Sequence, residues 1–166
     1  MAMSSAAIAS NGRYVNAGDV ANANSALRNS GLISATISGA LGGTSTAIGI
    51  GNTSRLNSLT NSGTITATAT TTNPSAVQTE AAYAINDQSG TLSKITNSGT
   101  IQAGTTQLTT PGFQSVQIAA YLGKNTTGVT FVNTGAVTGD VIFGQGADTL
   151  SVTGTSASSL STLVGN

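Results

Sequence analysis

ITNSGTI, at residues 95–101, is one of four near-copies of a seven-residue motif in this chain. The others are LRNSGLI at 27–33, LTNSGTI at 59–65 and FVNTGAV at 131–137. The central asparagines are Asn29, Asn61, Asn97 and Asn133, so successive copies are 32, 36 and 36 residues apart. A near-constant period of this length indicates structural units that stack on one another.

Each motif predicts a strand, a corner and a second strand. A large apolar residue two positions before each asparagine and another four positions after it predict two inward-pointing columns: Leu27, Leu59, Ile95 and Phe131, then Ile33, Ile65, Ile101 and Val137. At the corner, asparagine tolerates the left-handed backbone region, and we expect Gly31, Gly63, Gly99 and Gly135 to accept positive φ. Stacked corners would let the asparagine amides hydrogen-bond in a column, as amides do in cross-β structures.

The remainder of each period predicts a third strand. TAIGIGNTS, AAYAINDQSG and IAAYLGKNTTG each contain a short apolar strand, ending at Ile50, Ile85 and Leu122, and then a polar turn. In TITATAT (64–70) the residues alternate, which places Ile65, Ala67 and Ala69 inside and the threonines outside. The segments 71–79 and 105–113, with Pro74 and Pro111, interrupt the pattern and are expected to be longer loops that carry specificity.

The last part of the chain has a shorter period. Residues 135–154 predict strands around 136–138, 140–143 and 148–152, separated by glycine corners. The whole pattern predicts an all-β fold, a parallel β-helix or β-solenoid of about five three-strand coils. We expect an N-terminal partial coil or cap at 1–26, long coils of 32–36 residues over 27–134 and short terminal coils at 135–166.

The composition agrees with this fold and argues against two classes of partner, nucleic acid and membrane. Of the residues, 38% are hydrophobic, 4% aromatic and 6% charged, with 21 glycines and five basic residues against five acidic ones. Such a neutral chain gives no electrostatic signature of nucleic-acid binding. It has no apolar run long enough to insert directly into a membrane, and MAMSSAAIAS lacks the features of a signal peptide. We interpret Met1 to Met3 as a cloning start and expect a fragment.

The tail GDVIFGQGADTLSVTG (139–154), preceded by the NSGTI and NTGAV corners, resembles the passenger region of bacterial autotransporters, the type V secreted proteins of Gram-negative bacteria. The resemblance extends from about residue 27 onward. It implies a right-handed parallel β-helix that is displayed on the cell surface, outside the outer membrane, or secreted. It also implies that the C-terminal membrane barrel used for export lies outside this sequence. The absence of cysteine agrees with export through an oxidising periplasm.

The sequence predicts no catalytic, cofactor-binding or metal-binding residues. It has no histidine and no cysteine, which removes the usual nucleophile triads and transition-metal sites. The carboxylates Asp19, Glu80, Asp87, Asp140 and Asp148 are scattered along the chain. A glycan-active β-helix enzyme would need paired carboxylates on one face. Asp140 and Asp148, the only near pair, are interpreted as turn and strand-start residues.

Three weaker patterns have alternative interpretations. FGQGADTLSV (143–152) approaches a calcium-binding nonapeptide repeat but occurs once, so a glycine corner in which Asp148 binds turn amides is favoured. Tyr83 and Tyr121, in similar AAY settings, could form a carbohydrate-binding strip or pack under a loop. The threonines of 64–70 suggest an ice-binding face, which needs threonine at the same position in every coil. Thr64 aligns with Leu32, Thr100 and Ala136, so two of the three equivalent positions lack threonine.

We therefore expect a non-enzymatic structural and interaction segment of an autotransporter passenger that supports adhesion or self-association. The expected partners are a second copy, through exposed coil edges, and an unidentified ligand on a host or bacterial surface. The alternatives are a fragment of a glycan-active β-helix enzyme and an ice- or surface-binding solenoid.

Overall fold

The computed structural model describes residues 25–39, 43–71, 79–105, 114–153 and 163–164 of the 166-residue chain. Every regular element in these residues is a β-strand. In chain order they are β1 (Ala26–Asn29), β2 (Leu32–Gly39), β3 (Gly43–Ile50), β4 (Ser58–Asn61), β5 (Thr64–Thr71), β6 (Thr79–Asp87), β7 (Lys94–Asn97), β8 (Thr100–Thr105), β9 (Gln114–Tyr121), β10 (Thr130–Asn133), β11 (Ala136–Thr138), β12 (Asp140–Ile142), β13 (Thr149–Val152) and β14 (Leu163–Val164).

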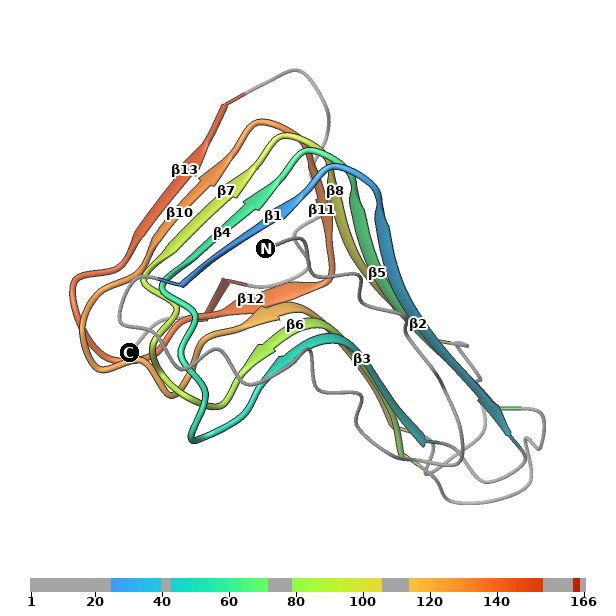
Figure 1. The fold of residues 1–166 in the computed structure, drawn as a ribbon. Coiled ribbons are helices and arrows are strands. Elements are labelled where there is room, and N and C mark those ends of the chain that lie inside the picture. The colour runs from blue at the N-terminus through green and yellow to red at the C-terminus, as the bar shows by residue number, and fades with distance from the viewer. Residues whose placement is uncertain (1–24, 40–42, 72–78, 106–113, 154–162, 165–166) are drawn as a thin grey trace.

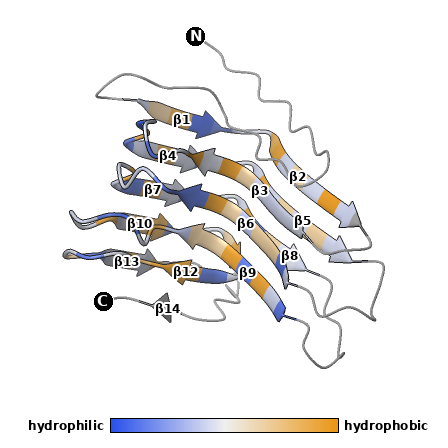
Figure 2. Ribbon diagram, turned by 90° about the horizontal axis from the view of Figure 1, so that it is seen from below, coloured by the Kyte–Doolittle hydropathy of each residue, from blue (hydrophilic) through white to orange (hydrophobic). Residues whose placement is uncertain are grey.

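The strands form three parallel sheets that make the sides of a coil stack. The first sheet has the order β1-β4-β7-β10-β13, the second β11-β8-β5-β2 and the third β14-β12-β9-β6-β3. Successive strands along the chain enter successive sheets, so the chain winds around the stack (Figure 1). Viewed from the side, the coils lie one beneath another (Figure 2). This confirms the predicted parallel β-solenoid of about five coils.

The strand pairing follows the repeated motif. Leu27 pairs with Leu59, Leu59 with Ile95 and Ile95 with Phe131 in the first sheet. In the second sheet, Ile33 pairs with Ile65, Ile65 with Ile101 and Ile101 with Val137. Large apolar side chains at equivalent motif positions therefore stack directly on one another, which is why the sequence repeats such residues at a fixed period.

A continuous apolar core fills the stack. Leu59, Ile65, Ile95, Ile101 and Phe131 are fully buried, and Val137 is 2% exposed. Leu27 and Ile33, in the first described coil, are partly buried and pack against this core. Both predicted columns thus lie on the inner face, with less cover at the N-terminal coil.

The strand β5 shows the predicted alternation. Its residues change regularly between partly exposed and buried, with Ile65, Ala67 and Ala69 inside. Ala67 and Ala69 pack with Ala82 and Ala103 in a second, smaller core cluster between the second and third sheets. Alanine fits there because the two sheets lie close together, at the narrow end of the profile in Figure 1.

Several predicted boundaries differ from the structure by one or two residues. The third-side strand ends at Ile50 as predicted, but β6 continues past Ile85 to Asp87, and Leu122 lies one position after β9. Asp87 belongs to β6 because it continues the ladder with β3, where it pairs with Ile50. The short terminal strands are β11, β12 and β13, close to the three that were predicted.

Other predictions fall outside the described residues. These are the N-terminal segment 1–24 with Asp19, the loop residues 72–78 and 106–113 with Pro74 and Pro111, and residues 154–162 and 165–166 of the terminal segment. Within the part of the chain that the structure describes, no helix is long and apolar enough to cross a membrane.

Candidate functional site: the asparagine ladder and the coil edge

The four motif asparagines form a ladder through the corner between the first and second sheets. Asn29 Nδ2 donates to Asn61 Oδ1 at 2.8 Å, Asn61 Nδ2 to Asn97 Oδ1 at 2.7 Å, and Asn97 Nδ2 to Asn133 Oδ1 at 2.7 Å. Asn61 and Asn97 are fully buried, Asn133 is 1% exposed and Asn29 is 8% exposed. The predicted column of amide hydrogen bonds is therefore present over four coils.

The amides of Asn29, Asn61 and Asn97 also bind the backbone of their own and the next corner. Asn61 Nδ2 lies 3.2 Å from the Gly63 carbonyl oxygen and 3.1 Å from that of Thr100, and Asn97 repeats both contacts with Gly99 and Ala136. A polar side chain in an apolar core is costly unless its hydrogen bonds are made. Here the amide joins two corners in one register, because only an identical corner presents these acceptors.

The motif glycines serve this stacking in a way that corrects the sequence prediction. Gly63, Gly99 and Gly135 do not have positive φ; among the described glycines that conformation occurs at Gly90, Gly139 and Gly146. A Cβ atom built on Gly63, Gly99 or Gly135 would instead lie 2.0–2.1 Å from the carbonyl oxygen of the corresponding glycine in the preceding coil. Glycine is required because the corner backbones touch, and not because the turn is left-handed.

Gly31 differs from the other three glycines. It occupies the same motif position, also without positive φ, but no heavy atom of the described residues lies within 4 Å of a Cβ atom built there. Its strand neighbours β1 and β2 each end a sheet among the described residues, and β3 ends the third. Asn29 Oδ1 accepts only the local Gly31 N–H, at 3.2 Å, among its described contacts. The N-terminal edge therefore presents a complete corner, to which a further asparagine corner could bind.

The opposite edge is chemically different. Asn133 pairs in register with Val152, so an apolar side chain takes the asparagine position in β13. Val152 is 47% exposed and Leu32, at the N-terminal edge strand β2, is 67% exposed. Each edge therefore combines open backbone with one exposed apolar side chain, an arrangement that favours pairing with another strand.

A second buried polar cluster lies at the turn after β6, where Asp87 is fully buried. Its Oδ1 accepts the backbone N–H groups of Ser89 at 2.9 Å and Gly90 at 3.1 Å, and the Ser89 hydroxyl at 2.6 Å. Its Oδ2 accepts the Leu92 N–H and Asn125 Nδ2, both at 3.0 Å. Asp87 thus fixes its own turn and ties it to the turn of the next coil.

The sequence pattern places Asp87 only among the scattered carboxylates and does not predict this role. The signal was present in the order Asp-Gln-Ser-Gly at 87–90, since an aspartate two residues before a Ser-Gly pair is typical of a turn closed by its side chain. Asn125 could not be found in that way, because the contact joins residues 38 positions apart.

The remaining carboxylates occupy separate places. Asp148 Oδ1 accepts the Val129 N–H at 2.6 Å just before β13, which agrees with its interpretation as a residue that binds backbone amides. Asp140 begins β12, and Glu80 is fully buried on β6. Across the described ranges, no three of the groups that bind metals in proteins gather into a possible metal site.

Two surface alternatives are not supported by the strand register. Tyr83 pairs with Ile118, whereas Tyr121 pairs with Asn86, so the two tyrosines stand three positions apart and do not form a strip. Thr64 pairs with Leu32 and Thr100, and Thr100 with Ala136, so the threonine rows on the second sheet are interrupted as the sequence predicted. A regular ice-binding lattice needs uninterrupted rows.

Comparison with known proteins found no significant match, either to a family model, to a curated protein or to a solved structure.

Proposed function

We propose that this chain is a non-enzymatic structural and interaction segment of an autotransporter passenger, displayed on the surface of a Gram-negative bacterium or secreted by it. In this role the coil stack is a rigid spacer, and its edges and outer faces make contacts that support adhesion or self-association. The resemblance of residues 139–154 and of the repeated corners to such passengers supports the assignment to that class.

The observation that carries the interaction role is the complete corner at Asn29 and Gly31, which no residue in the described part of the chain covers. In the three following coils the same corner is covered by a close backbone contact and an amide hydrogen bond. Gly31 retains the one residue type that permits such a contact, although no described atom makes it. A coil of a second copy, stacked on this edge, would extend the core and satisfy the edge backbone.

The buried polar residues support the structural part of the role. The ladder asparagines and Asp87 make hydrogen bonds that join neighbouring coils or close turns, so they hold the stack in one register. A stack fixed in this way keeps the equivalent surface residues of successive coils at a constant spacing along the axis. Such a surface suits repeated weak contacts along the axis, which multivalency makes stronger than any single contact.

The proposal is tested by two measurements on the purified chain. Light scattering at rising concentration measures its molar mass, and binding is measured on bacterial cells, host-matrix proteins and a glycan array. We expect saturable binding or reversible self-association. A chain that stays monomeric at every concentration and binds none of these surfaces would contradict the proposal.

The variant Gly31→Ala isolates the edge. Its added methyl group meets no described atom, so the fold should persist, but it would collide with a corner stacked from outside as it would at Gly63. Gly104→Ala is the matched control, because Gly104 also has no atom within 4 Å and lies inside β8. Self-association should weaken in the first variant and not in the second. Equal association in both would exclude the N-terminal edge as the contact.

A further inference from the structure

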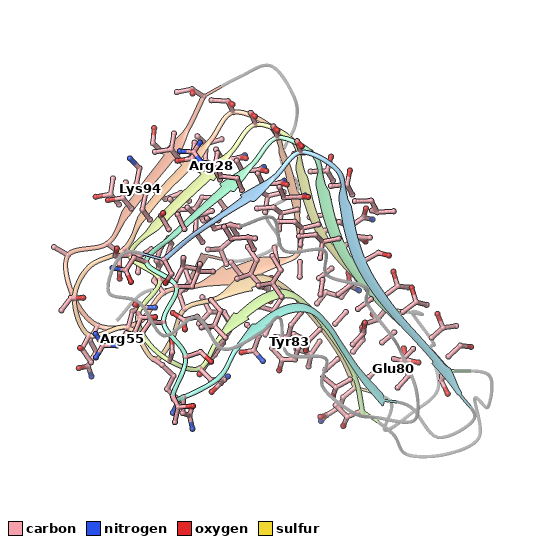
Figure 3. The ribbon with its side chains drawn as sticks, viewed as in Figure 1. Arg28, Arg55, Glu80, Tyr83 and Lys94 are labelled. Atoms are coloured by element: carbon pink, nitrogen blue, oxygen red, sulfur yellow. The ribbon has the colours of Figure 1, made fainter. Side chains whose placement is uncertain are left out.

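The exposed positive charges of the described residues gather on one side of the stack. Arg28 and Lys94 lie on strands of the first sheet, β1 and β7. Arg55 and Lys124 lie in the turns that lead from the third sheet back into the first. All four side chains are exposed. Figure 3 shows Arg28 and Lys94 at the first sheet and Arg55 at the turns below it, and we call this side of the stack the basic face.

The charges of the basic face repeat along the stack. Arg28 belongs to the first described coil and Lys94 to the third, and Arg55 and Lys124 belong to the turns that close the same two coils. Because neighbouring strands are about 4.8 Å apart, each pair is separated by roughly 10 Å along the axis. In the sheet register Arg28 aligns with Thr60 and Thr96, whereas Lys94 aligns with Ser58 and Ala26, so these two cations are offset across the sheet as well as along the axis. The basic face thus holds cations on two levels of the stack.

Among the described residues, negative charge does not neutralise these cations. The carboxylates of Glu80 and Asp87 are fully buried. Asp140 begins a strand of the third sheet. Asp148 is the acidic group at the basic face; it lies beyond the coils that carry the cations and binds the Val129 amide. The chain is neutral overall, yet its first sheet presents a positive field to solvent.

Small hydroxyl side chains occupy most positions between the cations. The outward residues of the first sheet include Ser58, Thr60, Thr96, Thr130 and Thr149, which lie on β4, β7, β10 and β13. The sheet's aromatic residue, Phe131, points inward and is fully buried. The basic face is therefore rich in hydroxyl groups and has no exposed aromatic ring among the described residues.

We propose that the basic face binds a linear acidic polysaccharide long enough to reach the cations on both levels of the stack. Carboxylate or sulfate groups of the polymer would form ion pairs with the cations. Its sugar hydroxyls would form hydrogen bonds with the serine and threonine hydroxyls that lie between the cations. Single-stranded nucleic acid fits less well, because its binding sites use exposed aromatic residues for base stacking.

This inference rests on the proposed interaction role and names one class of ligand for it. It does not involve the N-terminal edge. The two can therefore be separated: polysaccharide binding should be unaffected by Gly31→Ala, and self-association should be unaffected by charge changes on the basic face.

The test measures binding of the whole chain to heparin and to alginate by calorimetry, with uncharged dextran and a single-stranded oligonucleotide as comparisons. We expect binding to at least one of the acidic polymers. This binding should weaken as salt rises, because dissolved ions screen exposed charges, with a Debye length of about 8 Å at physiological salt. The double variant Arg28→Ser with Lys94→Thr should reduce the affinity by about tenfold or more, because two ion pairs are lost.

A matched pair of substitutions places the site. Thr60→Glu adds a negative charge to the basic face, at the position that pairs with Arg28. Thr66→Glu adds the same charge to the second sheet, at a similarly half-exposed threonine of the next strand. Affinity should fall in the first variant and stay unchanged in the second.

Four results would overturn the inference: no binding of either acidic polymer at low salt, dextran binding as tight as theirs, equal effects of the two glutamates, or tighter binding of the oligonucleotide. If any of these occurs while the chain still self-associates or binds cells, the proposed function stands and only the polysaccharide assignment fails.

Discussion

Asn61 Nδ2 donates a 2.7 Å hydrogen bond to Oδ1 of Asn97, a residue 36 positions further along the chain, and both side chains are fully buried. The bond joins two coils at the same corner, so it exists only when the coils are stacked in one register. A slip by one residue would place the asparagine of one coil against a serine of the next. The register is therefore fixed by a buried polar contact as well as by the apolar columns.

Removing one member of the ladder should destabilise the stack. Asn97→Ala removes the hydrogen bonds of Asn97 with Asn61, with Asn133 and with the carbonyl groups of Gly99 and Ala136, and a hydrogen bond contributes about 1 kcal/mol to stability. We expect the free energy of unfolding, measured by urea denaturation, to fall by about 3 kcal/mol. Asn52→Ala, at an exposed turn asparagine, is the control and should change it by less than about 0.5 kcal/mol. Equal effects would show that the ladder does not stabilise the fold.

A methyl group at a covered corner should be poorly tolerated. In Gly99→Ala the added Cβ would lie 2.0 Å from the Gly63 carbonyl oxygen, so two coils must separate. Overpacking of this kind costs about 3 kcal/mol or more when the neighbour is backbone. Gly104→Ala has open space and should be neutral or slightly stabilising. Thermal unfolding followed by circular dichroism compares them; a Gly99→Ala protein as stable as the wild type would contradict the close corner contact.

A charge in the apolar column should disrupt the middle coils. Ile101 is fully buried, and Ile101→Asp would place a carboxylate among Ile65, Val137 and the rest of the core. The control is Gln102→Asp, which introduces the same carboxylate at the next residue, on the exposed side of β8. We expect the first variant to be unfolded or insoluble at 25 °C and the second to retain the wild-type thermal midpoint. Similar midpoints would place Ile101 outside the core.

Loss of Asp87 should loosen the turn that it closes. Asp87→Ala removes the acceptor of the Leu92 and Gly90 amides and of Asn125 Nδ2, so we expect the unfolding free energy to fall by about 3 kcal/mol. Asp148 accepts one described amide, and Asp148→Ala should cost only about 1 kcal/mol. The comparison is made by denaturant titration. A larger loss for Asp148→Ala would reverse the assigned roles.

The fold could be predicted from sequence because its main determinant is periodic. The Asn-x-Gly corner and its flanking apolar residues recur at nearly constant spacing, and stacking brings equal residues together, so period, columns and amide ladder followed from the pattern. The alternation at 64–70 gave the facing of β5 for the same reason.

The errors arose where a residue's role depends on the neighbouring coil. Glycine at a corner is compatible both with positive φ and with close backbone contact, and only the position of the Gly63 and Gly99 carbonyl groups distinguishes them. Tyr83 and Tyr121 share a local sequence but differ in register by three positions, which no local pattern reveals. The basic face was missed because a neutral composition hides the segregation of charge that burial of Glu80 and Asp87 produces.

The most direct measurement is hydrogen exchange of the asparagine side-chain amides, followed by NMR. If the coils stack through the ladder, the Nδ2 protons of Asn61 and Asn97 should exchange at least about a hundredfold more slowly than those of exposed Asn52, because their exchange requires opening of the stack. Exchange of all three at the same rate would contradict the ladder, and with it the rigid stack on which both proposed surfaces depend.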